Sequence, residues 1–211
     1  MSVDDVPIEV ERKYDVDSRA VLPSLIGVGI VAAADAPEVF DLDATYFDTA
    51  DLALAAAKIA VRRRTGGHDA GWHIKWPRTG EGRPEQQFPL GDGTEPPSGV
   101  RAALAATIDA APLVPIARIR NRRAATVLRD ASGSPLVELA DDHVAAVDLL
   151  TGAERSWQEW EAELLPAAGR TREERDALLD AIEAVLRAAG ARPPSSGSKL
   201  ERALGRWQPS E

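Results

Sequence analysis

Charged side chains alternate with other residues in the stretch Pro7-Ile8-Glu9-Val10-Glu11-Arg12-Lys13-Tyr14, close to the start of the chain. Successive side chains of an extended strand point to opposite faces. Glu9, Glu11 and Lys13 therefore share one face, and Ile8 and Val10 share the other. The stretch predicts a β-strand with one strongly charged face.

A later stretch, 156–165, shows the same period of two. Glu159, Glu161 and Glu163 share one face there, and Trp160 lies on the other. Similar alternation occurs in several segments between these two stretches, and turns rich in glycine, proline and serine separate them. The further predicted strands are 42–48, 59–64, 72–76, 83–87, 115–129, 136–140 and 143–150.

Helical patterns occupy other segments of the chain. In residues 171–189, Thr171 and Glu174 form a capping box ahead of an apolar stripe that ends at Gly190. This combination predicts a helix with one face buried. Shorter helices are predicted at 17–27, at 100–108 and from Lys199 onward.

About eight strands joined by short turns predict a mainly β (α+β) fold. We expect a closed eight-stranded antiparallel β-barrel with helices packed outside. A chain of 211 residues is long enough for one core, so a single domain at 1–211 is expected, with its core at about 7–204. The net charge of −9 argues against a broad basic surface that binds nucleic acid.

The composition also limits the kind of metal site and the cellular location. There are no cysteines, so oxygen atoms or the three histidines would have to hold any metal. That donor set favours Mg²⁺ or Mn²⁺. The acidic first residues lack the features of a signal peptide, and no apolar run approaches membrane-spanning length. We expect a cytoplasmic protein without membrane contact, either a monomer or a homodimer.

The charged strand faces can be interpreted in two ways. Ordinarily, the polar face of such a strand meets water. Here, Glu or Arg recurs at every second position in strand after strand, and like charges so spaced repel unless opposite charges or a bound ion offset them. The pattern therefore favours faces turned into a shared lumen, with Arg62 and Arg64, and with Arg118, Arg120 and Arg122, pointing inward.

The order of these elements resembles that of the CYTH family of triphosphate tunnel metalloenzymes. The signature Glu-x-Glu-x-Lys is present as Glu9, Glu11 and Lys13. The resemblance covers about residues 7–204 and implies an eight-stranded tunnel, divalent-metal dependence and triphosphate substrates. The later matching elements are Tyr46-Phe47-Asp48-Thr49, Val61-Arg62-Arg63-Arg64, Ile74-Lys75, Arg83-Pro84-Glu85, Arg118-x-Arg120, Glu138 with Asp142, Glu159-x-Glu161-x-Glu163 and Ser198-Lys199.

Beside the resemblance, each charged residue has a physical role. The expected oxygen ligands for one or two Mg²⁺ or Mn²⁺ ions are Glu9, Glu11, Glu159, Glu161 and Glu163. The cations expected to bind phosphate are Lys13, Arg62, Arg64, Lys75, Arg83, Arg118, Arg120, Arg122 and Lys199. The expected catalytic residues are Glu161, Glu163 and Lys13. Glu85, Glu138 and Asp142 are expected to line the lumen without an assigned role.

Some residues carry alternatives. Interstrand ion pairs with the arginines are the alternative role for the glutamates, and Arg83 can pair with Glu85 instead of contacting substrate. Gln87 stands where the family often has an acidic residue, which puts a metal ligand there in doubt. His73 shares a face with Lys75 but stays outside the expected site, because a lone histidine more often has a structural role.

Three functions follow from these features. The first is metal-dependent hydrolysis of the terminal phosphoanhydride of an inorganic or organic triphosphate. The second is nucleotidyl cyclisation, since the CYTH family includes class IV adenylyl cyclases. The third is a non-catalytic module that binds polyphosphate or nucleotide. We favour hydrolysis, with a small-molecule triphosphate or polyphosphate as the partner. The glutamates at both ends of the chain argue against a pure binding module.

Overall fold

A computed structural model describes residues 7–205, except 81, 92 and 170. The outermost residues of the expected 1–211 domain lie outside this description. The strands are β1 (Ile8–Glu9), β2 (Glu11–Val16), β3 (Ala33–Ala34), β4 (Glu38–Asp48), β5 (Ala60–Thr65), β6 (Gly71–Lys75), β7 (Arg83–Phe88), β8 (Val114–Arg129), β9 (Pro135–Asp148) and β10 (Glu154–Leu164). The helices are α1 (Ala53–Ala56), α2 (Ser98–Ile108), α3 (Arg172–Ala188) and α4 (Lys199–Ala203).

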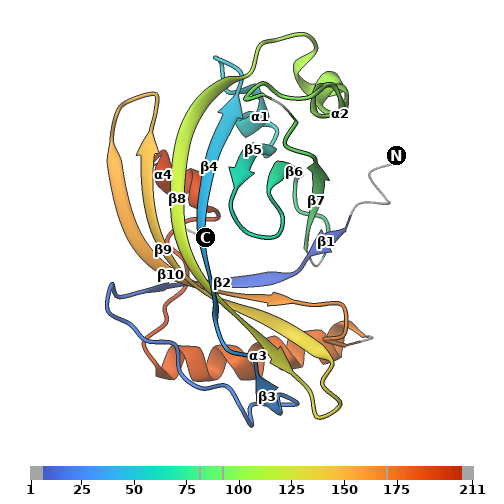
Figure 1. The fold of residues 1–211 in the computed structure, drawn as a ribbon, viewed down its shortest axis with the longest axis vertical. Coiled ribbons are helices and arrows are strands. Elements are labelled where there is room, and N and C mark those ends of the chain that lie inside the picture. The colour runs from blue at the N-terminus through green and yellow to red at the C-terminus, as the bar shows by residue number, and fades with distance from the viewer. Residues whose placement is uncertain (1–6, 81, 92, 170, 206–211) are drawn as a thin grey trace.

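The strands pair in the order β1-β7-β6-β5-β4-β8-β9-β10-β2, and all pairs are antiparallel. Because β1 and β2 stand at opposite ends of this order and only Val10 separates them, the amino-terminal segment closes the sheet into a barrel (Figure 1). If β1 and β2 are counted as one interrupted strand, and β3, which pairs with β8 off this path, is set aside, eight strands surround the lumen. The predicted antiparallel barrel is confirmed, and its sheet has ten strands where eight were expected, because the first strand is interrupted and β3 is added.

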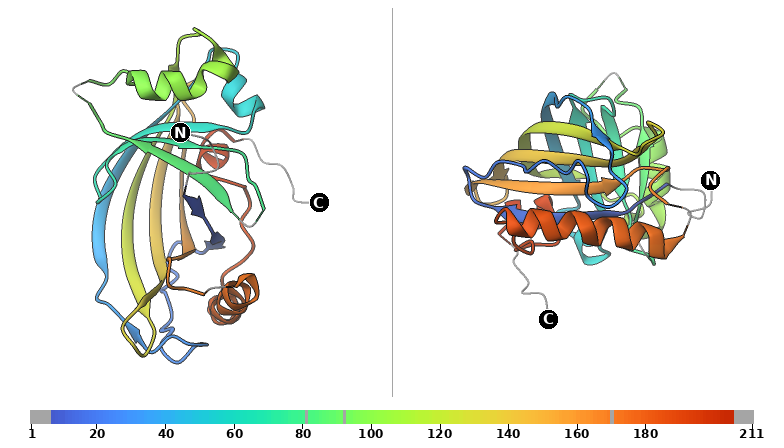
Figure 2. Two further views of the ribbon diagram at one scale, coloured as in Figure 1. Left: turned by 90° about the vertical axis from the view of Figure 1, so that its right-hand side faces the viewer. Right: turned by 90° about the horizontal axis from the view of Figure 1, so that it is seen from below.

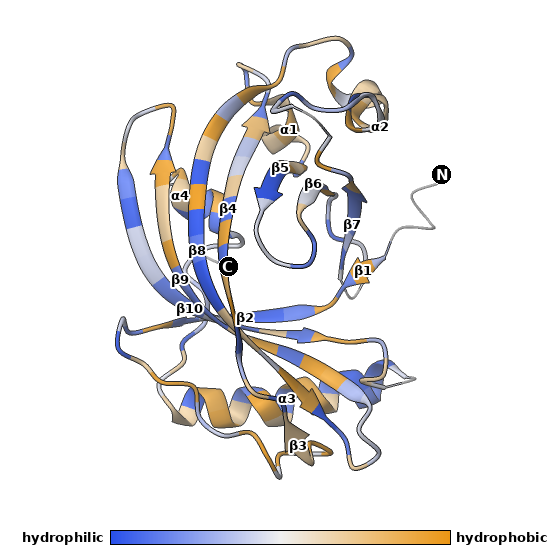
Figure 3. Ribbon diagram, viewed as in Figure 1, coloured by the Kyte–Doolittle hydropathy of each residue, from blue (hydrophilic) through white to orange (hydrophobic). Residues whose placement is uncertain are grey.

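Two apolar cores lie outside the barrel, where outward apolar residues of the strands meet helices α3 and α2. Trp160 of β10 and Tyr14 of β2 pack with Leu178 and Ile182 of α3. At the other end of the long axis, Trp72 of β6 packs with α2 (Figures 1 and 2). Apolar and polar residues alternate along the long strands β4, β8 and β10 (Figure 3). On β10 this alternation turns Trp160 outward and Glu161 and Glu163 into the lumen, whereas on β4 and β8 apolar residues such as Leu42 and Ile119 face the lumen.

The long helix α3 is the predicted helix at 171–189. The Thr171 side chain accepts a hydrogen bond from the Glu174 backbone N–H, and the Glu174 side chain accepts one from the Thr171 backbone. The predicted capping box is thus confirmed, and Gly190 follows the helix with φ of 101°. The short α4 begins after Ser198 and packs against β8 and β9 inside the barrel.

Two local predictions were wrong. Residues 17–27 form turns instead of a helix: Pro23 cannot donate a helical hydrogen bond, and Leu25 is buried against the core that contains α3. The predicted interruption between 140 and 143 is absent, since β9 runs unbroken from Pro135 to Asp148. Among the described residues, no helix combines the length and apolar character needed to cross a membrane.

Candidate active site

The lumen contains a cavity of about 510 Å³. Acidic and basic side chains from β1, β2, β5, β6, β7, β9, β10 and α4 line it together. The predicted site residues found in its wall are Glu9, Glu11, Lys13, Arg62, Arg64, Lys75, Arg83, Glu138, Glu161, Glu163 and Lys199. Most of the residues singled out in the sequence therefore converge on one enclosed space.

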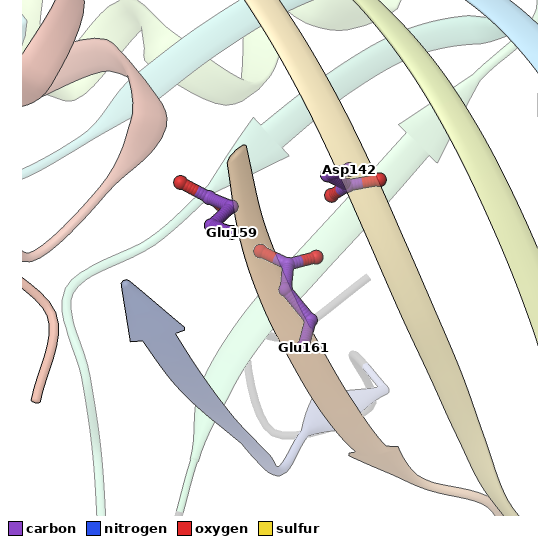
Figure 4. A group of neighbouring side chains, drawn as sticks. All are labelled: Asp142, Glu159 and Glu161. Carbon is purple, nitrogen blue, oxygen red and sulfur yellow. The ribbon is translucent and has the colours of Figure 1, made fainter. Parts of the chain in front are cut away.

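Three buried carboxylates form one cluster beside this cavity, the carboxylate trio of Asp142, Glu159 and Glu161 (Figure 4). Asp142 comes from β9, and the two glutamates come from β10, where Glu159 lies directly opposite Asp142 in the register. One oxygen from each residue lies within 4.8 Å of the others. Three hard oxygen donors at this spacing can hold a divalent cation.

In this structure, the ammonium group of Lys199 occupies the centre of the carboxylate trio. Its Nζ lies 2.8 Å from Asp142, 2.5 Å from Glu159 and 2.7 Å from Glu161. Lys199 is the first residue of α4, so the helix start places this charge in the lumen. The three carboxylates are thus already arranged around a positive charge.

Two further cations surround Glu161. Lys13 Nζ lies 2.6 Å from Glu161 and 3.0 Å from Glu11. Arg123 donates from Nε to Asp142 over 2.8 Å and from Nη2 to Glu161 over 2.5 Å. Burial alone would raise the pKa of Glu161, but the charges of Lys13, Lys199 and Arg123 outweigh it and hold the pKa well below its usual range. Glu161 is therefore ionised in the closed lumen.

A second charged cluster lies on the β5–β7 side. Lys75 Nζ bridges Glu9, at 2.5 Å, and Glu85, at 2.7 Å. The buried His73 ring contacts Glu85 through Nδ1 and the Asp69 carbonyl oxygen through Nε2 at 2.9 Å. Burial lowers the pKa of His73 to about 4 against the opposing hydrogen bond with Glu85, so the ring is neutral at pH 7 and its single N–H donates to only one of these two acceptor oxygens. His73 points inward and orients Glu85, a role that the sequence pattern left open.

The pKa of Glu163 is raised, whereas that of Glu161 is lowered. Burial, followed by the nearby charges of Glu9 and Glu11, raises the pKa of Glu163 to about 8. Its strand register places it opposite Glu11 on β2 and opposite Glu138 on β9. Acidic residues therefore crowd this part of the lumen, and a cation would relieve their repulsion.

The arginines of β5 carry positive charge that the described residues leave incompletely paired. Arg62 lies 3.5 Å from the Tyr46 hydroxyl and 3.6 Å from Glu85, and Arg64 pairs with Asp69. Both Nε atoms are buried without a hydrogen-bond partner among the described residues. Burial, with the charges of Arg62 and Arg123, lowers the pKa of Arg64 to about 9. Buried donors and mutually repelling cations are suited to an anionic ligand.

The prediction that Arg118, Arg120 and Arg122 line the lumen was wrong. All three are exposed on the outer face of β8, where Arg118 donates to Asp43 over 2.9 Å. The inward face of β8 carries Ile119, Asn121 and Arg123 instead. The run of arginines permits either face, and packing places the apolar Ile119 between them in the lumen wall.

The other predicted residues lie in or beside the cavity. Arg83 lines it, but its guanidinium donates to the backbone oxygens of Trp76, at 2.8 Å, and of Lys58, at 3.0 Å, which favours a structural role. The buried Glu85 contacts Lys75 at its wall, and Gln87 lines it. Arg123, Tyr46 and Asn121 also line the cavity, although no role was predicted for them. Tyr46 lies in an element that matches the family, and the order of charges gives no signal for Asn121.

Comparison with protein families and curated proteins places these observations in context. A family profile described as the CYTH domain matches residues 7–203. Two uncharacterized proteins of Mycobacterium tuberculosis, from strains CDC 1551 / Oshkosh and ATCC 25618 / H37Rv, are each 38% identical over 215 residues, which cover 97% of this chain. The match covers 41% of each relative, so the chain spans less than half of their length.

Solved structures share the fold. A protein from Pyrococcus horikoshii OT3 superposes with a TM-score of 0.57 at 17% identity, covering 94% of this chain and 99% of that one. A candidate adenylate cyclase from Bacillus halodurans gives 0.57 at 21% identity, covering 92% and 96%. An adenylyl cyclase candidate from Hippeastrum, described as having a dominant triphosphatase activity, gives 0.55 at 18%, covering 96% and 98%. With the barrel, its charged lumen and a profile match over nearly the whole chain, the protein belongs to the CYTH domain family.

Proposed function

We propose that this chain is a divalent-metal-dependent phosphohydrolase that acts on a triphosphate bound in the lumen of a single tunnel domain. The single observation that supports the proposal is that buried carboxylates and incompletely paired arginines lie at the same cavity. The carboxylate trio lies beside it, and Arg62 and Arg64 line it with buried Nε donors that have no partner among the residues the structure describes. Neither feature alone distinguishes a metal–phosphate site from ordinary ion pairing.

The residues present fit Mg²⁺ or Mn²⁺. Such hard cations prefer carboxylate oxygens, and the carboxylate trio already surrounds the positive charge of Lys199. The trio would hold the cation, with Glu9, Glu11 and Glu163 as further proposed ligands. A bound divalent cation supplies charge neutralisation at the phosphate oxygens. With a cation held there, Lys199 would leave the trio, and its ammonium group would be free for the phosphate chain.

The chain's own cations position the substrate in the proposed reaction. Arg62, Arg64 and Arg123 hold phosphate oxygens through guanidinium groups, and Lys13 and Lys75 add point charges. Water adds to the outer phosphorus as the terminal anhydride P–O bond breaks, so orthophosphate leaves and the shortened phosphate chain remains. These fixed charges favour the transition state because negative charge spreads over its equatorial oxygens.

Catalytic roles are proposed for Glu161, Glu163 and Lys13. Glu161 has the largest set of close cationic partners, with Lys13, Arg123 and Lys199 all within 2.7 Å. Lys13 keeps Glu161 and Glu11 in place and lies within the same cavity wall. A small phosphorylated substrate also fits the cytoplasmic location expected from the sequence.

Nucleotidyl cyclisation is the second candidate, and the description of the Bacillus halodurans structure favours it. The description of the Hippeastrum protein favours hydrolysis. Both belong to proteins below 25% identity, so neither decides the activity of this chain. The reaction product has to decide between them.

A product assay tests the proposal. Purified protein is incubated with tripolyphosphate, thiamine triphosphate, ATP or polyphosphate, with Mg²⁺, with Mn²⁺, or with EDTA. We expect metal-dependent release of orthophosphate. Cyclic AMP as the main product would replace hydrolysis by cyclisation, and unchanged ligands in all mixtures would leave a binding module.

A further inference from the structure

One acidic residue of the cavity wall, Asp69, has no part in the proposed metal site. It lies in the loop 66–70 between β5 and β6 (Figure 1), whereas the proposed metal ligands all come from strands. Its carboxylate forms an ion pair with Arg64, one of the arginines proposed to hold phosphate. In this structure, a negative charge of the protein thus occupies a guanidinium group that the substrate is expected to use.

The surroundings of Arg64 explain why this guanidinium group retains an anion. Its side chain is only 9% exposed, and its Nε has no hydrogen-bond partner among the described residues. Burial and the positive charges of Arg62 and Arg123 lower the pKa of Arg64 to about 9. A buried cation beside two others is stabilised by a nearby negative charge. Asp69 supplies that charge here.

A carboxylate and a phosphate bind a guanidinium group in the same manner. The fork of N–H donors fits two oxygens of either anion. Asp69 and a substrate phosphate would therefore compete for Arg64. A phosphate that binds there has to displace the carboxylate, and two negative charges that stay close to each other repel. In both cases, Asp69 lowers the affinity of the tunnel for a phosphate chain.

The carboxylate of Asp69 can leave Arg64 while the barrel stays closed. The Asp69 side chain is 39% exposed, so the acid has room to turn towards water, in contrast to the buried arginine. The backbone of the loop is packed against its neighbours. The Asp69 carbonyl oxygen lies 2.9 Å from His73 Nε2, and a Cβ atom at Gly66 would collide with the backbone of β4. Release of Arg64 thus needs a rotation of one side chain, with the loop in place.

We propose that Asp69 determines the substrate affinity of the tunnel: its carboxylate holds Arg64 as an internal substitute for a phosphate group and turns away when a phosphate chain binds. This inference rests on the proposed function, because it requires a phosphate chain among the tunnel cations. Asp69 does not contact the reacting atoms. It sets how tightly the substrate is bound, and the chemistry is left to the other charged residues.

The test compares the affinity for tripolyphosphate in matched variants. Asp69→Asn removes the charge and keeps the size of the side chain and the backbone carbonyl, and Asp69→Glu keeps the charge. The control is Asp43→Asn, because Asp43 pairs with Arg118 and Arg120 on the outer face of the barrel. This control removes the same charge from an ion pair outside the cavity. Calorimetric titration in Ca²⁺ measures binding, and a thermal melt verifies that each variant is folded.

We expect Asp69→Asn to raise the affinity for tripolyphosphate by about fivefold, near the upper limit for a partly exposed ion pair. Asp69→Glu should gain much less, and Asp43→Asn should stay within about twofold of the wild type. In an Arg64→Gln background, Asp69→Asn should also change the affinity by less than about twofold, since the group for which the two anions compete has been removed.

Unchanged or weaker binding in a folded Asp69→Asn variant would overturn the role of Asp69. An equal gain in Asp69→Glu, in Asp43→Asn or in the Arg64→Gln background would also overturn it, because the gain would then not come from competition for Arg64. The proposed function stands in all of these cases if orthophosphate is still released. It fails separately, if the wild-type protein releases no orthophosphate from any triphosphate with Mg²⁺ or Mn²⁺.

Discussion

The charged and apolar walls of the tunnel differ although the same alternation builds both. On the charged wall, formed by β2, β10 and β5–β7, carboxylates and cations hold one another in place, as Lys13 does with Glu161. On the apolar wall, formed by β4, β8 and α4, Ile119 and Leu42 leave Asn121 without a described partner. Most of the charged side chains thus come from one set of strands, with Arg123 of β8 and Lys199 of α4 joining them from the other, so substitutions can test the two walls separately.

The largest effect is expected from a substitution of Glu161 on the charged wall, which tests the role of that wall in hydrolysis. Glu161→Gln removes a carboxylate that several cations share, so hydrolysis of every triphosphate should fall at least on the order of a hundredfold, since even outer partners of metal ligands cost 10–100-fold. Steady-state orthophosphate release measures the effect. The control is Glu154→Gln, on the same strand but exposed. Undiminished turnover in Glu161→Gln would remove this residue from the site.

Arg62 tests the phosphate-binding part of the charged wall. Arg62→Gln removes a buried guanidinium whose Nε has no partner in the described part of the chain, so affinity for tripolyphosphate should fall by about 10–100-fold, the range of a charge-assisted hydrogen bond. Calorimetric titration in Ca²⁺ or without metal measures binding apart from turnover. Arg120→Gln on the outer face should bind as the wild type does; an equal loss there would contradict the inward assignment.

His73 tests whether the charged wall is stabilised by a neutral ring. Its folded pKa of about 4 is below the ordinary value of 6.5, so the folded state binds fewer protons and stability is lost as the pH falls from 6.5 towards 4. The expected contribution is a loss of about 2 kcal/mol by pH 5. Urea unfolding of metal-free protein between pH 7 and pH 5 measures it. His73→Gln should show a shallower decline, and parallel curves would refute the prediction.

Substitution of Lys199 has the smallest expected effect, and it tests the assignment of the carboxylate trio as the metal site. If its ammonium group competes for the carboxylate trio, Lys199→Met should raise the affinity of the ligand-free protein for Mn²⁺ by about tenfold. Electron paramagnetic resonance of free Mn²⁺ measures this without turnover. Lys58→Met is the matched control, because Lys58 is an exposed lysine with no described contact to the trio. Unchanged or weaker Mn²⁺ binding in Lys199→Met would exclude the competition.

The sequence predicted the barrel and most of the charged wall because both depend on local alternation. Glu9, Glu11 and Glu161 each need only the alternation of their own strand to turn the side chain towards the lumen. The face of β8 could not be predicted in this way, since Arg122 and Arg123 are consecutive cations and only packing decides which points inward. Likewise, the segment around Leu25 forms turns instead of the expected helix, because Leu25 packs into the core that contains α3.

Contacts between distant segments were also beyond local patterns. Lys199 meets Glu161 across 38 residues of chain, because the segment after α3 returns to the lumen and starts α4 there. The Asn121 acceptor has no periodic signal, and it becomes noticeable only when its neighbours are known to leave it unpaired. The charge pattern thus indicates which kind of ligand the tunnel can bind, and the path of the chain decides which charged side chains pair with one another.

The split first strand links the integrity of the barrel to its chemistry. The seam between β1 and β7 consists of two register pairs, Ile8 with Pro84 and Glu9 with Arg83. The same short segment supplies Glu9, Glu11 and Lys13 to the cavity. A protein cut just after Lys13 would therefore lose its lateral closure and three of its inward charges in a single event. Proteolytic nicking of this segment would consequently report on tunnel opening and on loss of ligand binding at once.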